Sequence, residues 1–548
     1  MEVKSRQELD KLVFKRQAER VESFKKLREE YNLDNDAASQ AILQLDDATL
    51  LAKLRGGSLK ATVVLKAYMA KALQVTDNCN CITEFIPQAK QWAEELDMPN
   101  AVKGPLHGLP IALKEDYDVE GMDSTLGFAK KLYQPAKKHA VLVKILRSLG
   151  AVPFAKTNVP QSLLSYACDN PIYGITTNPK NKFLSPGGSS GGSGAIMGGS
   201  GAVFSMGSDI GGSLRIPAHF NGAVTLRGTV DRLSVRGVNA CIMDKLVGAV
   251  GVPGVIGNSA SFVSLVYKEL LKDSLQNKED PRAVPIPWND ELYLSDNKLR
   301  IGYYTSLPFF PTIGDTGKTI LDAKAALESL GHSVVEFQMP DDFHYIGIIN
   351  ALLHADGGKI FRELFHLEQI ALATKGLVAN AYAPEWKRKL VANMFPIFGG
   401  SSKRGAMLAR TMLDARSSDD LWEKMYQKKL VRNYILDKME EQELDLILCP
   451  VFPFPACKLA EAAELLFAVV YTMIWNIVDF PAGVLPFGVE SGKNICAYDD
   501  EGDAMLKMAK ESVTESAGMS IGVQLVAKPF KEELVLRVMT ELEKTSKK

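Results

Sequence analysis

The sequence predicts an α/β protein built on one large sheet that helices cover. Two observations lead to this prediction. From about residue 81 onward, short apolar runs that favour strands alternate with segments whose apolar residues recur at helical spacing. The chain of 548 residues is also 46% hydrophobic and 24% charged, as ordinary globular proteins are. Without an internal repeat or a clear linker, we expect one domain over residues 46–548, preceded by a helical extension over residues 1–45.

The expected elements follow one another along the chain. Residues 1–31 carry an apolar stripe at helical spacing, formed by Leu9, Val13, Phe24 and Leu27. A helical hairpin interrupted at Gly56 and Gly57 comes next. Strands are expected within residues 107–119, 151–155, 299–305, 332–338, 444–450, 480–487 and 519–527, and helices within 139–150, 322–331 and the last residues of the chain.

Residues 246–267 form an uncharged apolar stretch long enough to span a membrane. Its first part contains four glycines and Pro253, which argue against a membrane helix. We therefore predict a glycine-rich loop, a helix N-cap at Asn258 or Ser259, and a buried helix over residues 261–271.

Composition excludes several classes of protein. A net charge of −1 gives no general attraction to nucleic acid or to acidic membranes. Seven cysteines over this length form no disulfide framework, and Cys79 and Cys81 have no second pair to complete a zinc site. The N-terminus lacks the apolar core of a signal peptide. We expect an intracellular protein with no metal, no cofactor and no membrane-spanning helix, either cytosolic or attached to the surface of an internal membrane.

Residues 185–229 contain the best candidate for an active site. Glycine- and serine-rich runs are usually flexible linkers, but this one is interrupted by apolar segments and lies mid-chain, which is typical of a folded loop. A phosphate-binding loop would need a Lys-Ser or Lys-Thr after the glycines, and Gly194 is followed by AIMGG. Residues 187–191 fit the G-x-S-x-G pattern of α/β-hydrolases, yet no apolar strand precedes them and more glycines follow.

A serine nucleophile is the remaining interpretation. Ser213 follows small residues whose amide groups can point at one spot, as in an oxyanion hole. Such a serine needs a base, and His219 and a buried, neutral Lys114 are the candidates. A single histidine is more often a packed or capping residue, and a lysine at a strand end is usually a solvated surface residue. The residues alone leave the base open.

Four segments together resemble the amidase signature family of serine hydrolases: residues 104–116, 157–162, 178–192 and 207–222. The resemblance implies that family's fold, a large mixed twisted β-sheet covered on both faces by helices. It also implies that Ser213 is the nucleophile, that Ser189 on a cis peptide bond is the bridging serine, and that Lys114 is the base. The amides of Ile210, Gly211, Gly212 and Ser213 would form the oxyanion hole. Because a carboxylate would keep Lys114 charged, we expect the chain to turn away after Lys114 or Asp116 to be paired elsewhere.

Within that family, residues 157–179, 468–487 and 523–539 resemble fatty acid amide hydrolases. The resemblance implies cleavage of N-acylethanolamines and primary fatty amides through an acyl-enzyme, and a homodimer. Helices within about residues 370–400 would form a membrane cap. In it, residues 382–398 would be an interfacial helix with Trp386, Leu390, Met394 and Ile397 on one side. The positions that match the acyl channel are Leu163, Leu164, Tyr166, Val469 and Met473.

Two alternatives remain at this stage. One is an amidase of small polar amides or a glutamine-hydrolysing amidotransferase subunit, which would need charged groups to grip its substrate. The other is an inactive relative that binds lipid.

Overall fold

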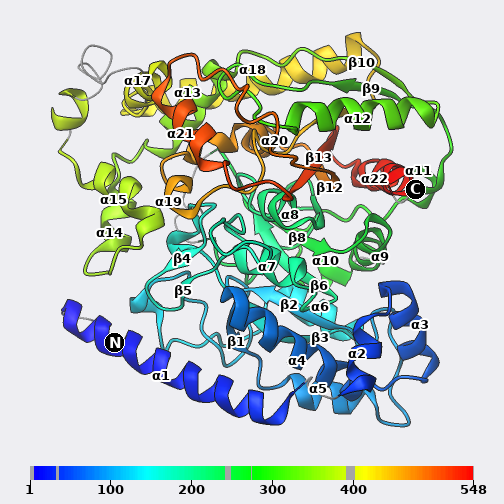
Figure 1. Ribbon diagram of the computed structural model, residues 1–548. Helices are drawn as coiled ribbons and strands as arrows, with labels where there is room; N and C mark the ends of the chain where they lie inside the picture. The colour runs from blue at the N-terminus through cyan, green and yellow to red at the C-terminus, as the bar shows by residue number, and fades with distance from the viewer. Residues whose placement is uncertain are drawn as a thin grey trace.

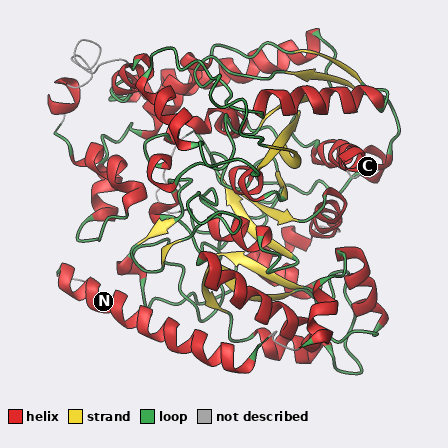
Figure 2. Cartoon of the chain, viewed as in Figure 1, coloured by secondary structure: helices red, strands yellow, loops and turns green. Residues whose placement is uncertain are grey.

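The structure is a computed structural model that describes residues 5–32, 36–240, 248–272, 275–384, 386–390 and 402–546. One eleven-stranded sheet runs through it in the order β1-β3-β2-β6-β8-β7-β12-β13-β11-β9-β10 (Figure 2). Its strands are β1 (Ile82–Phe85), β2 (Pro110–Lys114), β3 (Val152–Thr157), β6 (Phe204–Asp209), β7 (Val224–Arg227), β8 (Val252–Gly257), β9 (Arg300–Tyr303), β10 (Ser333–Glu336), β11 (Leu446–Pro450), β12 (Ala482–Val489) and β13 (Ser520–Ala527). A separate pair is formed by β4 (Asp169–Asn170) and β5 (Gly174–Ile175).

The sheet is mixed. β2 runs parallel to β3 and β6, and β9 runs parallel to β10 and β11. The pairs β1–β3, β6–β8, β7–β8, β7–β12, β12–β13 and β11–β13 are antiparallel. The predicted fold class is therefore confirmed.

Helices surround this sheet (Figure 1). The α-helices are α1 (Arg6–Glu30), α2 (Ala37–Leu43), α3 (Asp47–Gly56), α4 (Ala61–Cys79), α5 (Ala89–Leu96), α6 (Val141–Ser148), α7 (Gly191–Gly198), α8 (Arg215–Asn221), α9 (Ala260–Leu270), α10 (Leu275–Glu279), α11 (Asp290–Leu294), α12 (Thr316–Ser329), α13 (Asp342–Leu353), α14 (Lys359–Phe365), α15 (Lys375–Tyr382), α17 (Lys403–Thr411), α18 (Ser418–Glu441), α19 (Leu459–Ala462), α20 (Val470–Ile477), α21 (Ala504–Ser512) and α22 (Glu532–Ser546). Short 3₁₀ turns are η1 (Ala129–Lys131), η2 (Gln161–Leu163), η5 (Leu372–Thr374) and η6 (Leu466–Val469).

Two neighbouring residues of β12 show why both faces of the sheet are covered. A side chain added at Gly483 would meet Val535 and Met539 of α22. Val484 lies against Gly522 of β13, which itself lies against His219 of α8. Because successive residues of a strand point to opposite faces, α22 and α8 cover opposite faces of the sheet.

The N-terminal helix α1 lies along one edge of the molecule (Figure 1). Its apolar stripe is largely as predicted, since Leu9, Val13 and Phe24 are buried. Arg16 is also buried and forms ion pairs of 2.8 Å with Glu84 and 2.9 Å with Asp123. A highly charged helix is thus attached to the sheet domain by both apolar and ionic contacts.

Two expectations around the glycine-rich segments are wrong. Residues 252–257 form the central strand β8 instead of a loop, although the helix α9 with its N-cap Ser259 is confirmed. Only glycine fits at position 254 of this strand, because a Cβ there would lie 2.5 Å from the Leu214 side chain and 2.6 Å from the Leu226 carbonyl oxygen. The glycines after Ser190 were expected to belong to a folded loop. They form the buried helix α7, where small residues allow close packing.

The predicted interfacial helix lies only partly within the described residues. Trp386 and Leu390 are 67% and 46% exposed, and residues 386–390 are helical, whereas Met394 and Ile397 fall outside the described ranges. Among the described residues, no helix has the length and apolar character needed to cross a bilayer.

Candidate active site

The candidate site lies where the parallel strands β2 and β6 end. Lys114 is the last residue of β2, and Asp209 is the last residue of β6. Because these strands pair in parallel, with Leu113 opposite Met206, their carboxyl ends meet at the same edge of the sheet. Ser213 lies between β6 and α8, and Ser189 lies just before α7. Residues from two strands and two loops are thus brought together.

Lys114 is completely buried. Its Nζ lies 2.9 Å from the Ser189 Oγ and 2.7 Å from the Ser208 Oγ. Burial lowers the pKa of the Lys114 ammonium below its ordinary value, which favours the neutral amine that a base requires. The alternative interpretation of a solvated surface lysine is therefore wrong.

The chain turns after Lys114, as expected, but the expectation that Asp116 would be kept away from the lysine is wrong. β2 ends at Lys114, but the following turn brings the Asp116 Oδ2 to 3.4 Å from the Lys114 Nζ. The Ser208 hydroxyl donates to the same oxygen at 2.6 Å. Asp116 therefore acts against the effect of burial on the pKa of Lys114, although burial is the larger of the two effects.

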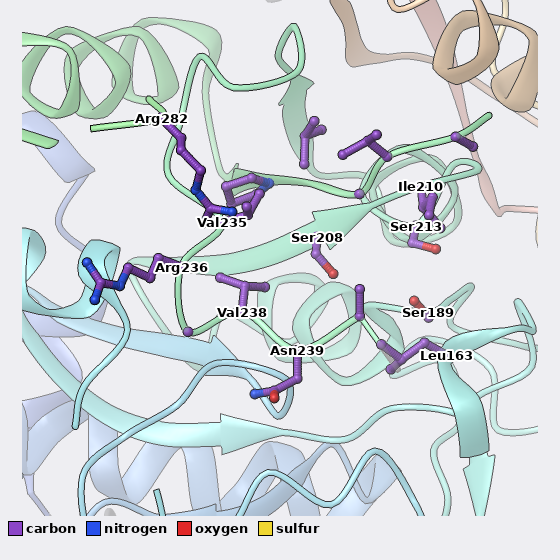
Figure 3. A pocket seen from close by; sticks show the side chains of 17 residues that line it. Leu163, Ser189, Ser208, Ile210, Ser213, Val235, Arg236, Val238, Asn239 and Arg282 are labelled. Carbon is purple, nitrogen blue, oxygen red and sulfur yellow. The ribbon is translucent and has the colours of Figure 1, made fainter. Parts of the chain in front are cut away.

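The bridging position is built around a cis peptide bond between Gly188 and Ser189, as predicted. Only glycine fits at position 188, because a Cβ there would lie 2.5 Å from the Ser165 carbonyl oxygen and 2.9 Å from the Tyr166 Cα. The Ser190 amide donates to the Ser213 carbonyl at 3.2 Å, which ties the two serine loops together. Figure 3 shows the side chains of Ser189 and Ser213 in one cavity.

The loop that carries Ser213 is held by the buried carboxylate of Asp209. It accepts hydrogen bonds from the amides of Gly212 (2.8 Å) and Leu214 (3.1 Å), from Arg215 Nε (3.0 Å) and from Asn476 Nδ2 (2.8 Å). Burial alone would raise the pKa of the Asp209 carboxyl, but Arg215 and Asn476 hold that pKa well below its ordinary value. The carboxylate is therefore ionised at neutral pH and fixes the loop.

This arrangement corrects one member of the predicted oxyanion hole. The Gly212 amide donates to Asp209, so it is already engaged. The amides of Ile210, Gly211 and Ser213 have no acceptor among the described residues. The Thr472 hydroxyl donates to the Gly211 carbonyl at 2.7 Å, which orients the peptide that follows Gly211. Three of the four predicted donors remain available.

Two cavities meet at Ser213. The first is apolar and is lined by Ser213 and by all five residues expected along an acyl channel, which are Leu163, Leu164, Tyr166, Val469 and Met473. The second is lined by Ser189, Ser208, Ser213 and residues 235–240 and 249–253, among others (Figure 3). Leu163, which lines both, has a left-handed backbone (φ 64°) that is rare for a bulky residue.

His219 has a structural role. Its Nδ1 accepts a hydrogen bond from the Gly522 amide (2.8 Å), and its Nε2 lies 3.1 Å from the Phe454 carbonyl oxygen. Both ring nitrogens are thus engaged with the backbone, and the Nε2 must carry the proton. Burial lowers the pKa of His219 to about 4. Lys114 is therefore the base candidate that the structure places beside a serine.

Several residues of the site were missed by the sequence analysis. They are Ser208, which contacts Lys114, and Arg215, Thr472 and Asn476, which fix the Ser213 loop. Ser208 and Arg215 lie within the recognised motif at 207–222, whereas Thr472 and Asn476 lie about 260 residues away along the chain, in the segment 468–487, where nothing in the sequence ties them to the Ser213 loop. In the described ranges, no group of three or more histidine, cysteine or acidic residues could hold a metal ion.

Comparisons with known proteins place this site in context. A family model described as Amidase matches residues 63–536. The chain is 32% identical to Fatty-acid amide hydrolase 1 of Sus scrofa over 536 residues, covering 96% of this chain and 90% of that protein. It is 34% identical to Fatty acid amide hydrolase 1 of Caenorhabditis elegans (91% and 88% covered), and 30% identical to Acetamidase of Emericella nidulans (92% and 90% covered).

A solved structure titled Fatty acid amide hydrolase matches with a TM-score of 0.78 at 24% identity, covering 98% of this chain and 90% of that one. A 6-aminohexanoate cyclic dimer hydrolase matches with a TM-score of 0.68 at 22% identity, covering 92% and 97%. These structural matches support the fold.

The engaged histidine leads to a prediction about stability. Unfolded His219 takes up a proton near its ordinary pKa of 6.5, but in the folded protein that pKa is about 4. The unfolded state therefore binds more protons in this window, and the free energy of unfolding falls as the pH is lowered, by up to about 3 kcal/mol. Urea denaturation at several pH values should show that His219→Gln removes this part of the pH dependence. Equal slopes for the two proteins would contradict the assignment.

Proposed function

The chain belongs to the amidase family of amide-hydrolysing enzymes, and we propose that it cleaves fatty acid amides into fatty acid and amine. In this proposal Ser213 is the nucleophile, Ser189 the bridging serine and Lys114 the base. The observation that carries the proposal is the 2.9 Å contact between the buried Lys114 amine and Ser189, beside a serine at the end of an apolar cavity. A buried amine next to a hydroxyl is suited to accept its proton.

The proposed first step transfers protons along this chain of residues. Neutral Lys114 takes the proton of Ser189, which takes that of Ser213 as the Ser213 Oγ attacks the amide carbonyl. The negative charge on the carbonyl oxygen is then stabilised by the amides of Ile210, Gly211 and Ser213. These donors are preorganised, because Asp209 and Thr472 hold their loop before substrate arrives.

The later steps use the same residues in reverse. The ammonium of Lys114 returns its proton through Ser189 to the departing nitrogen, the carbon–nitrogen bond breaks, and the amine leaves. The acyl group stays on Ser213 as an ester. Water then attacks that ester, giving its proton to the relay, and the fatty acid and free Ser213 are released.

The lining of the apolar cavity favours a long acyl chain. Among the described residues, no charged side chain lines it. A glutamine-hydrolysing enzyme would need groups that bind the ammonium and carboxylate of an amino acid, and two arginines, Arg236 and Arg282, line the other cavity at Ser213. Two relatives that are named fatty acid amide hydrolases match the chain over nearly its whole length, which agrees with this substrate class.

The first test concerns the proposed nucleophile and base. A fluorophosphonate probe should label Ser213, and Ser213→Ala should abolish both labelling and hydrolysis of oleamide. Lys114→Ala should slow both about 10²- to 10⁴-fold, because the serine then lacks its base. The matched control is Lys156→Ala, which removes another buried lysine, from the neighbouring strand β3, and should lower stability only. Peptide mapping that placed the probe on a different serine would refute the assignment.

The second test concerns the acyl cavity. Val469→Phe should fill part of it and lower kcat/KM for an oleoyl amide about tenfold or more, while short-chain amides are affected less. Val489→Phe is the control, because that residue is 63% exposed. The same panel should include glutamine and acetamide. Comparable turnover of glutamine and oleamide by the unmodified enzyme would show a polar amidase instead.

We also propose that the segment 382–398 attaches the enzyme to membrane surfaces, since Trp386 is 67% exposed next to basic residues. Trp386→Ser should reduce co-sedimentation with phosphatidylcholine–phosphatidylserine vesicles, whereas Phe183→Ser, which removes another aromatic residue that is 61% exposed, should leave it unchanged.

By family resemblance we further propose a homodimer, which sedimentation equilibrium tests directly. A monomer at micromolar concentration would contradict it.

A further inference from the structure

The Lys114 amine has three polar neighbours, one of which the proposed relay does not use. Its Nζ lies 2.9 Å from Ser189, 2.7 Å from Ser208 and 3.4 Å from Asp116. Lys114 and Asp116 are completely buried, and Ser208 is partly buried. Ser208 also contacts Asp116 at 2.6 Å, so Lys114, Ser208 and Asp116 form a closed triangle beside the relay.

The chemistry of these groups fixes the direction of each hydrogen bond. An ionised carboxylate only accepts, so the Ser208 hydroxyl donates its single proton to Asp116 and must accept from Lys114. A neutral amine has two N–H groups and one lone pair. With one N–H donated to Ser208 and the other on the side of the Asp116 carboxylate, which is in ion-pair contact at 3.4 Å, the lone pair is left facing Ser189.

We propose that Asp116, acting together with Ser208, is a positioning residue that directs the lone pair of Lys114 at Ser189 and stabilises the ammonium formed during attack. The inference rests on the proposed function of Lys114 as base. After proton transfer the ammonium has three N–H groups, and Ser189, Ser208 and Asp116 provide an acceptor for each. No side chain has to move between the two protonation states.

The other ionisable groups near Lys114 do not substitute for Asp116. Asp209, at the end of β6, is paired with Arg215 at 3.0 Å. Cys168 is buried, which raises the pKa of its thiol to about 12 and keeps it neutral. The Tyr117 hydroxyl donates to the Gly207 carbonyl, and burial raises its pKa well above the ordinary value. Asp116 is the facing carboxylate whose only contact with a cationic side chain, among the described residues, is with Lys114.

Further contacts hold the backbone of Asp116 in place, and its carboxylate remains partly unsatisfied. The Asn239 side chain and backbone amide both donate to the Asp116 carbonyl oxygen, at 3.0 and 2.9 Å. Within the described residues, the buried Asp116 Oδ1 has no hydrogen-bond partner. A buried carboxylate without full hydrogen bonding is destabilising, so its position beside Lys114 calls for an explanation.

A pH dependence follows from the charge of Asp116. A carboxylate this close favours the ammonium form of Lys114, and so raises the pH at which the free amine becomes available. Removing that charge should shift the acidic limb of the activity profile to lower pH. It should also lower the rate at the plateau, because the lone pair is no longer directed at Ser189 and the amine is a weaker base.

The experiment measures the pH profiles of oleamide kcat/KM and of fluorophosphonate labelling in the full-length protein. Asp116→Asn keeps the shape of the side chain and should move the acidic limb down by about 1 to 3 pH units. Asp116→Glu restores the charge and should bring the limb back toward that of the unmodified enzyme. Ser208→Ala removes the bridging hydroxyl and should slow labelling at the plateau about tenfold or more.

The control is Glu115→Gln. Glu115 is equally buried and adjacent in sequence, but it accepts hydrogen bonds from Thr125 and Leu126, away from Lys114. This change should lower stability without moving the limb. If Asp116→Asn is active and its acidic limb of the activity profile lies at the same pH as in the unmodified enzyme, the inference is overturned. If Asp116→Asn does not fold, labelling of Ser208→Ala at the unmodified rate overturns it instead. If the unmodified enzyme neither labels nor hydrolyses amides, the proposed function itself is overturned.

Discussion

The buried ion pair between Asp209 and Arg215 is the interaction on which the site depends. Asp209 ends a central strand, and Arg215 begins the helix after the loop that carries Ser213, so their pairing closes that loop. Arg215 also donates to the Thr472 carbonyl and to the Gln524 side chain, both at 2.9 Å. One guanidinium thereby joins the first half of the chain to α20 and β13. Breaking such a pair would leave an uncompensated charge in the core, which is strongly destabilising.

Most of the fold could be predicted from local pattern. The strand at 446–450 is a continuous apolar run and the strand at 520–527 a largely apolar one, and the amphipathic helix 141–148 is closed by the nearby Gly150. Strand β8 could not be predicted in this way. Its glycine at 254 is required by the Leu214 side chain and the Leu226 carbonyl oxygen, which lie far away in sequence. Local propensity indicates a loop there, and tertiary packing overrides it.

The site was predictable only where its residues lie in recognisable motifs. A lysine at a strand end is usually a surface residue, so only the family resemblance identified Lys114 as part of the site. The residues that contact the Lys114 amine could not be predicted from the sequence. Asp116 approaches it through a turn, and Ser208 approaches it from another strand. The engaged amide of Gly212 was hidden for the same reason, since it depends on where the Asp209 side chain points.

The surroundings of Lys114 combine two opposed effects on one amine. Burial favours the neutral form, and Asp116 favours the charged form. A base that was only buried would be neutral but weak, and one that was only paired would be charged and unable to accept a proton. With both effects present, the amine is able to accept a proton and its charged form is stabilised when it does. An acyl chain in the adjoining apolar cavity would exclude water from Ser213 and strengthen the electrostatic interactions around the relay at the moment of attack.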